Sequence, residues 1–182
     1  MNIRQATRDL HRIRTILGKL YPSPWVASGI SKGGQTTLYY RYFFPEDVVA
    51  SVPYVAPINL SLEDERIYAF LDEVGSGQCR RQIQAIQRRI LDEYDASLLR
   101  LKWHAKGAEY QFGYLSLEEA FEYAVLEYPF SFWQWGADCD ALPKANASLE
   151  VILDHFLEIS GLGFFSDDGM VNYASHYYQC AA

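Results

Sequence analysis

Ser31 lies at the centre of a short glycine pattern, Gly29-Ile30-Ser31-Lys32-Gly33. A serine on a very tight turn between a strand and a helix presents its hydroxyl above the sheet edge, and glycines two residues away let the strand and helix approach. The backbone N–H of the next residue then points to the place where an oxyanion would form. The spacing predicts Ser31 as a nucleophile, the Lys32 N–H as an oxyanion donor, and Gly29 and Gly33 as the glycines of the turn.

The sequence around the pattern provides the strand and the helix that such a turn needs. Pro22 and Pro24 lead into a short strand-like run, and the segment from Thr36 to Phe44 continues without a helix breaker until Pro45. A plain structural turn is the competing interpretation. A phosphate-binding loop is excluded, because the pattern Gly-x-x-x-x-Gly-Lys-Ser/Thr is not present.

Length and composition favour a folded, water-soluble chain. The 182 residues suit one ordinary domain, and an aromatic content of 15% excludes a disordered chain. No uninterrupted apolar run is long enough to span a membrane. The histidines form no ligand pair and the cysteines have no metal-type spacing. We therefore predict no metal and no cofactor.

The cysteines, Cys79, Cys139 and Cys180, are odd in number, so at least one is unpaired. We expect them to be small buried or half-buried side chains.

Charge is distributed unevenly along the chain. Residues 1–108 carry 15 Lys/Arg and 11 Asp/Glu (+4), whereas residues 109–182 carry one lysine and 12 Asp/Glu (−11). The acidic half argues against nucleic acid as a partner. It is either a solvated surface or a surface that attracts a cation, such as the free amino terminus of a peptide.

Periodicity and capping residues predict the order of the elements. Residues 2–20 form an amphipathic helix without a preceding cap, 25–28 a strand, 33–44 a helix and 48–56 a second buried strand. A helix to 74 follows, then one from 77 to 105 with a break near 95–97. Capping serines Ser116, Ser148 and Ser166 begin helices that run to just before Pro129, to 160 and, from 167, to the end.

This order predicts an α/β chain, mostly helical, in two parts. Residues 1–58 are expected to form a partial α/β-hydrolase core with the nucleophile elbow, and residues 59–182 a helical lid. Both ends of the sequence lie within predicted helices, so we expect an internal fragment of a longer protein. Two strands alone leave apolar edges exposed, and we expect these edges to favour homo-oligomers.

Four blocks carry a family likeness: residues 25–37 (WVASGISKGGQTT), 40–48 (YRYFFPEDV), 52–57 (VPYVAP) and 127–136 (EYPFSFWQWG). They resemble the secreted tripeptidyl aminopeptidases, a family of bacterial serine peptidases often named prolyl aminopeptidases. The resemblance implies an α/β-hydrolase with a helical lid and a Ser-Asp-His triad that releases short peptides from a free N-terminus. It also implies export, to the outside or to the periplasm.

Only Ser31 and the Lys32 N–H are carried over from the family, because its acid and histidine follow later strands. We expect the acid, the histidine and the second oxyanion donor to lie outside this chain, which is then inactive by itself. The alternative is a non-catalytic helical module that binds peptides or oligomerises. The two hypotheses differ in whether a base lies within hydrogen-bond reach of Ser31.

A triad assembled from residues of this chain is the weaker interpretation. His155 and His176 lie within predicted helices, and His11 and His104 are typical of surface or core-edge positions. The acids that follow Ser31 in a suitable order are Asp138, Asp140, Asp154 and Asp167.

Two features of the expected lid suit a peptide substrate. Residues 130–135 are aromatic-rich and form either a substrate-facing wall or lid core. Glu118, Glu119, Glu122 and Glu127 are either solvated or include the anchor for a substrate ammonium group.

Overall fold

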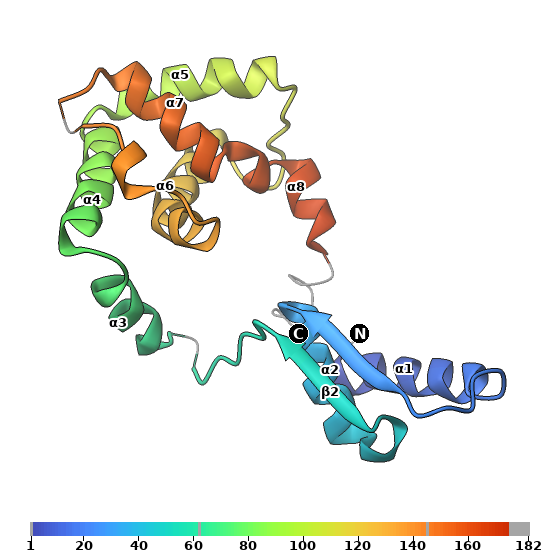
Figure 1. Ribbon diagram of the computed structural model, residues 1–182. Coiled ribbons are helices and arrows are strands. Elements are labelled where there is room, and N and C mark those ends of the chain that lie inside the picture. The colour runs from blue at the N-terminus through green and yellow to red at the C-terminus, as the bar shows by residue number, and fades with distance from the viewer. Residues whose placement is uncertain (1, 62, 145, 175–182) are drawn as a thin grey trace. The chain divides into compact units, whose positions relative to one another are not determined.

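The computed structural model describes residues 2–61, 63–144 and 146–174, and it divides into two compact units (Figure 1). The first unit extends to Asp64 and contains two paired strands, and the second, Glu65–Ala174, is helical. The chain is therefore mostly helical with a small parallel sheet, as the sequence predicts. The wider hydrolase sheet stays a prediction.

The first unit has a strand, a covering helix and a second, parallel strand. Its elements are α1 (Ile3–Leu17), β1 (Val26–Ile30), α2 (Lys32–Phe43), the 3-10 turn η1 (Pro45–Asp47) and β2 (Ala50–Tyr54). The two strands pair in register from Val26 opposite Ala50 to Ile30 opposite Tyr54. The strands therefore end together, and the turn that carries Ser31 lies at their carboxyl edge.

The start of α1 differs from the prediction of an uncapped helix. Asn2 precedes the helix in an extended conformation, and its side chain accepts a hydrogen bond of 2.9 Å from the Gln5 N–H. Asparagine is among the best N-cap residues because its short amide reaches the N–H groups of the first turn.

The sheet of the first unit is covered on one face. On β1, Ala27 and Gly29 are half-buried, whereas Val26 and Ile30 are 57% and 70% exposed. Parallel strands are normally buried on both faces. The described first unit therefore presents an apolar sheet face to its surroundings.

The second unit consists of helices joined by short connections. They are α3 (Glu65–Glu73), α4 (Gly77–Asp92), α5 (Tyr94–Gly107), α6 (Leu117–Gln134), η2 (Cys139–Ala141), α7 (Leu149–Ser160), η3 (Leu162–Phe165) and α8 (Asp167–Asn172). Serine side chains cap α6, α7 and α8 as predicted, and α6 begins with a full capping box. The break between α4 and α5 falls at Glu93, just before the predicted 95–97.

The prediction that a helix ends before Pro129 is wrong. The helix α6 continues through Pro129 to Gln134. Proline removes one hydrogen bond from a helix interior. Tyr128 and Phe132, on either side of it, have no exposed surface, so burial of these rings in the core offsets that loss.

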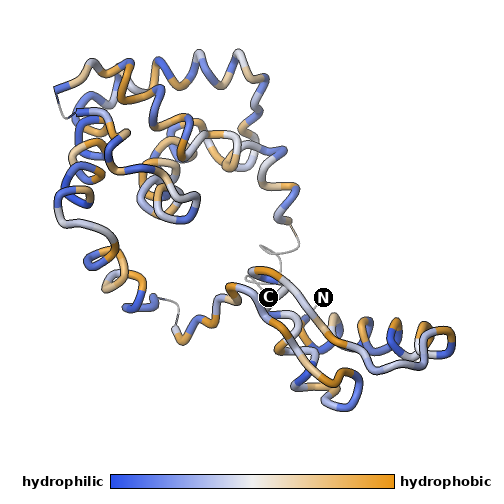
Figure 2. The backbone as a smooth tube through the Cα atoms, viewed as in Figure 1, coloured by the Kyte–Doolittle hydropathy of each residue, from blue (hydrophilic) through white to orange (hydrophobic). Residues whose placement is uncertain are grey.

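The helices of the second unit enclose a continuous apolar core. Figure 2 shows hydrophobic and hydrophilic positions alternating along these helices, which is the pattern of amphipathic helices around a core. The buried residues of this core come from α4, α5, α6 and α7 and from the connections near them: Cys79, Ile83, Ile86, Ile90, Leu101, Ala105, Phe121, Ala124, Val125, Tyr128, Phe132, Leu142, Ile152, Leu153, Phe156 and Leu162.

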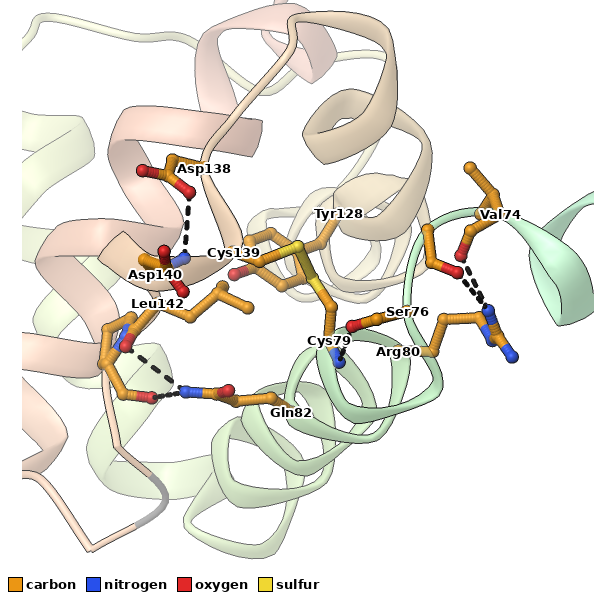
Figure 3. Close-up of a disulfide and its surroundings, with 12 residues drawn as sticks. Val74, Ser76, Cys79, Arg80, Gln82, Tyr128, Asp138, Cys139, Asp140 and Leu142 are labelled. Carbon is orange, nitrogen blue, oxygen red and sulfur yellow. Dashed lines mark hydrogen bonds between the residues drawn. A yellow bond between two sulfur atoms is a disulfide. The ribbon is translucent and has the colours of Figure 1, made fainter.

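A disulfide between Cys79 and Cys139 joins the start of α4 to η2 (Figure 3). Sequence analysis did not predict this pairing, because the two cysteines are 60 residues apart and only folding brings their Cα atoms to 5.6 Å. Gln82, one turn along α4, donates hydrogen bonds of 3.3 Å to the carbonyls of Leu142 and Pro143 in the same connection. Cys180 lies outside the described residues.

Candidate active site

Ser31 occupies the turn between β1 and α2. Its φ is 54° and its ψ is −121°, a backbone conformation that side-chain-bearing residues rarely adopt. The Ser31 N–H donates to the Tyr54 carbonyl at 2.9 Å, and the Ser31 carbonyl accepts from the Gln35 N–H at 3.1 Å. A strained serine between a strand and a helix is the structural context that the glycine pattern requires.

The close approach of strand and helix depends on two glycines. A Cβ at Gly29 would lie 2.3 Å from the carbonyl carbon and oxygen of Gly33. A Cβ at Gly34 would lie 2.9 Å from both the Tyr54 oxygen and the Ala56 Cβ. A Cβ at Gly33 itself would meet no atom within 4 Å. The structure therefore places the steric requirement on Gly29 and Gly34, and Gly33 takes part through its backbone.

Lys32 is the first residue of α2 and directly follows Ser31. The amino end of a helix carries partial positive charge, which favours an anion at that point. This position is consistent with the predicted oxyanion donor, which stays a prediction.

Among the described residues of the first unit, the histidine is His11, and it lies at the opposite edge of the sheet from Ser31. Its Nδ1 contacts Asp47 Oδ2 at 2.6 Å, and Asp47 also accepts a 2.7 Å hydrogen bond from the Tyr40 hydroxyl. Asp47 ends η1, before β2 begins, whereas Ser31 follows the end of β1. The five residues of β1 separate these edges by about 16 Å at about 3.3 Å per residue. His11 and Asp47 therefore hold α1 against η1 and do not reach Ser31.

The His–Asp contact is supported by stacking. The His11 ring lies against the Phe44 ring with centroids 4.3 Å apart and planes 9° apart. Burial and the hydrogen bond to Asp47 raise the pKa of the Tyr40 hydroxyl, so Tyr40 stays a hydrogen-bond donor to Asp47 at physiological pH.

The other histidines that the structure describes have partners within the helical unit. His155 Nε2 lies 3.0 Å from the Tyr128 hydroxyl, and burial lowers the pKa of His155. The His104 ring lies beside the Tyr110 ring. His176 lies outside the described residues.

Three candidate acids of the helical unit, Asp138, Asp154 and Asp167, also have local partners. The carboxylate of Asp138 accepts from the Asp140 N–H at 2.9 Å, and that of Asp154 pairs with Arg100 at 3.0 Å. Asp167 accepts from the N–H of Gly113 at 2.8 Å and fastens the loop before α6 to the start of α8. Each of these contacts fits a structural role.

The aromatic segment 130–135 is partly core. Phe132 is fully buried, and the Trp133 ring fills the space beside Gly75, where a Cβ would lie 2.4 Å from it. Trp135 is 73% exposed. Of the two predicted roles for this segment, lid core describes Phe132 and Trp133, and among its aromatic side chains Trp135 presents most of its surface.

The four glutamates of α6 differ in environment. Glu119 belongs to the capping box, and its hydrogen bonds with Ser116 lower its pKa. Glu118 is exposed, and Glu122 accepts from the Tyr94 hydroxyl at 3.4 Å. Glu127 is half-buried, and burial raises its pKa. Glu127 is therefore the acid of this group whose ionised form is least well solvated.

Val55 is a residue of this region that sequence analysis missed. It follows β2 with a φ of 43°, in the left-handed region. The sequence offers no signal for it, because a β-branched residue in an apolar run predicts a continuing strand.

Within the described ranges, the structure shows no group of three or more potential metal ligands. No helix there is long and apolar enough to cross a membrane.

Comparison with known proteins places the chain in a peptidase family. The model of the family described as PS-10 peptidase S37 matches residues 1–182. The chain belongs to this family. A relative is the prolyl tri/tetrapeptidyl aminopeptidase of Streptomyces mobaraensis, which is 34% identical over 183 residues. The match covers 98% of this chain and 38% of the relative, so the chain spans less than half of that protein's length. No solved structure matches the S37 chain.

Proposed function

We propose that this S37 chain carries the nucleophile region of a serine aminopeptidase that releases short peptides, such as tri- and tetrapeptides, from a free N-terminus. The observation that carries the proposal is Ser31, held at positive φ between a strand and a helix by the Tyr54 carbonyl and the close contact of Gly29 with Gly33. The name of the Streptomyces relative supports the peptide substrate.

In the proposed reaction the Ser31 oxygen attacks the peptide carbonyl and the Lys32 N–H stabilises the oxyanion. A base takes the serine proton and returns it to the leaving amine, and water then hydrolyses the acyl-enzyme. Within the described first unit His11 is held at the far edge of the sheet. In the α/β-hydrolase order the acid and the histidine follow the serine after later strands. We therefore assign the base, its acid partner and the second oxyanion donor to polypeptide outside this chain, which we expect to be inactive by itself.

Charge and burial in the acidic half of the chain support recognition of a substrate ammonium group. Residues 109–182 carry a net charge of −11. Glu127 is the candidate anchor, because a half-buried carboxylate gains most from a cation that replaces lost solvation.

The disulfide supports export. Disulfides form and persist in oxidising compartments such as the periplasm and the extracellular space. The Cys79–Cys139 bond is consistent with a secreted or periplasmic parent protein.

Reaction with a fluorophosphonate probe tests the nucleophile. We expect slow labelling of the chain at Ser31, faster labelling when imidazole is added as a substitute base, and no labelling of Ser31→Ala. Ser28→Ala, in the strand β1 that leads to Ser31, is the matched control and is expected to label like the wild type. An adduct on another residue, or equal labelling of Ser31→Ala, would refute the nucleophile. Fast labelling without imidazole, lost in His155→Ala or His176→Ala, would place the base inside this chain.

A second candidate function rests on the helical unit, whose closed core needs no contribution from the strands. Such a unit could bind peptides or form oligomers without catalysis, and the exposed sheet face of the first unit supports self-association. Peptide binding that persists while imidazole fails to restore labelling at Ser31 would favour this alternative.

A further inference from the structure

The turn that follows β2 contains a second strained residue beside Ser31. Val55 has a φ of 43°, and a β-branched side chain in this region crowds the backbone. Such conformations cost on the order of 1–3 kcal/mol and persist where the surrounding contacts determine them. The contacts around Val55 show what holds it.

The residues on both sides of Val55 contact the elbow. Tyr54 accepts the hydrogen bond of the Ser31 N–H, and the Ala56 Cβ lies where a side chain on Gly34 would clash. Beyond them, the side-chain amide of Gln35 donates to the Pro57 carbonyl. The turn is therefore fastened to the elbow and to the first turn of α2 along its whole length, which fixes Val55 close to Ser31.

The side chain of Val55 contributes little to the fold of the first unit. Val55 is 79% exposed, so the first unit obtains almost no packing from it to offset the strain. A glycine would adopt this φ without strain. The structure thus places an apolar side chain at the carboxyl edge of two parallel strands, which is the edge where ligands bind in open α/β sheets.

We propose that Val55 is a specificity-determining residue that contacts the apolar side chain of the peptide residue transferred to Ser31. This inference rests on the proposed function. Because the turn is already fixed, the contact requires little ordering on binding, and a peptide residue with an apolar side chain or a prolyl ring gains more from it than glycine does.

Binding of a product-like peptide tests the proposal without requiring catalysis. The probe is Ala-Ala-Pro with a free amino terminus and a free carboxylate, and the reference is Gly-Gly-Gly. The chain is labelled with carbon-13 in its valine methyl groups, and Val55→Thr identifies the Val55 signals. We expect these signals to shift to saturation with Ala-Ala-Pro, and we expect Gly-Gly-Gly to bind at least about tenfold more weakly.

Two glycine variants provide the matched comparison. Val55→Gly is expected to weaken Ala-Ala-Pro binding about tenfold, with thermal unfolding no lower than in the wild type because glycine relieves the strain. Val49→Gly removes a valine that is 62% exposed just before β2, at the other edge of the sheet, and is expected to leave binding unchanged.

Three results would overturn the proposal: no binding of Ala-Ala-Pro, binding without a shift at Val55, or equal binding by Val55→Gly. Fluorophosphonate labelling of the same samples reports separately on Ser31. A failed nucleophile and a failed Val55 contact are therefore distinguished.

Discussion

Opening the disulfide between Cys79 and Cys139 is expected to destabilise the helical unit strongly. The bond closes a loop of about 60 residues that contains α4, α5 and α6. In the chain-entropy model, a loop of this length restricts the unfolded chain by about 4 kcal/mol at 25 °C. This value is a large part of the stability of an ordinary domain, which is about 5–15 kcal/mol.

Urea unfolding of wild type and Cys79→Ala/Cys139→Ala measures the effect. Trp103, Trp133 and Trp135 lie in the helical unit, so tryptophan fluorescence mainly follows its unfolding. With a urea dependence of about 1.5 kcal/mol per molar, a loss of about 4 kcal/mol lowers the midpoint by roughly 2.5 M. Reduction of the wild type should shift the midpoint by the same amount.

The double variant also serves as the control, because reduction should not change it further. A non-reducing tryptic map should link the peptide 67–80 to the peptide 107–144. Three free thiols in the oxidised wild-type protein would refute the disulfide. A urea midpoint that falls by less than about 0.5 M on reduction or in the double variant would refute its stabilising effect.

Two further predictions concern the elbow and α6. Gly29→Ala, whose Cβ would meet Gly33, is expected to cost about 1–3 kcal/mol and to speed hydrogen exchange in α2. In Gly33→Ala the new Cβ meets no atom within 4 Å, so this variant should be as stable as the wild type or more stable by up to about 1 kcal/mol. Equal hydrogen exchange in α2 of the two variants would contradict the close packing of Gly29 against Gly33. Glu127→Gln should raise the melting temperature at pH 7, because burial raises the pKa of Glu127 and penalises its ionised form. The gain in melting temperature should vanish when the pH falls below about 4.3, the ordinary pKa of a glutamate carboxyl group. A gain that does not depend on pH would contradict a buried, ionised Glu127 as its cause.

The sequence alone predicted the strand–turn–helix around Ser31 because the signals there are local. Glycine spacing, flanking prolines and the capping serines of α6, α7 and α8 act over three or four residues, so they can be interpreted without the fold. The continuation of α6 through Pro129 could not be predicted in this way, because core packing outweighs a local helix breaker.

Tertiary structure decided the features that depend on contacts between distant residues. Cys79 meets Cys139 across 60 residues, and His11 pairs with Asp47 at the edge of the sheet away from Ser31. The positive φ of Val55 arises in a turn that the elbow holds on both sides. Single-sequence patterns carry residue types and spacing, whereas these features depend on which segments the fold brings together.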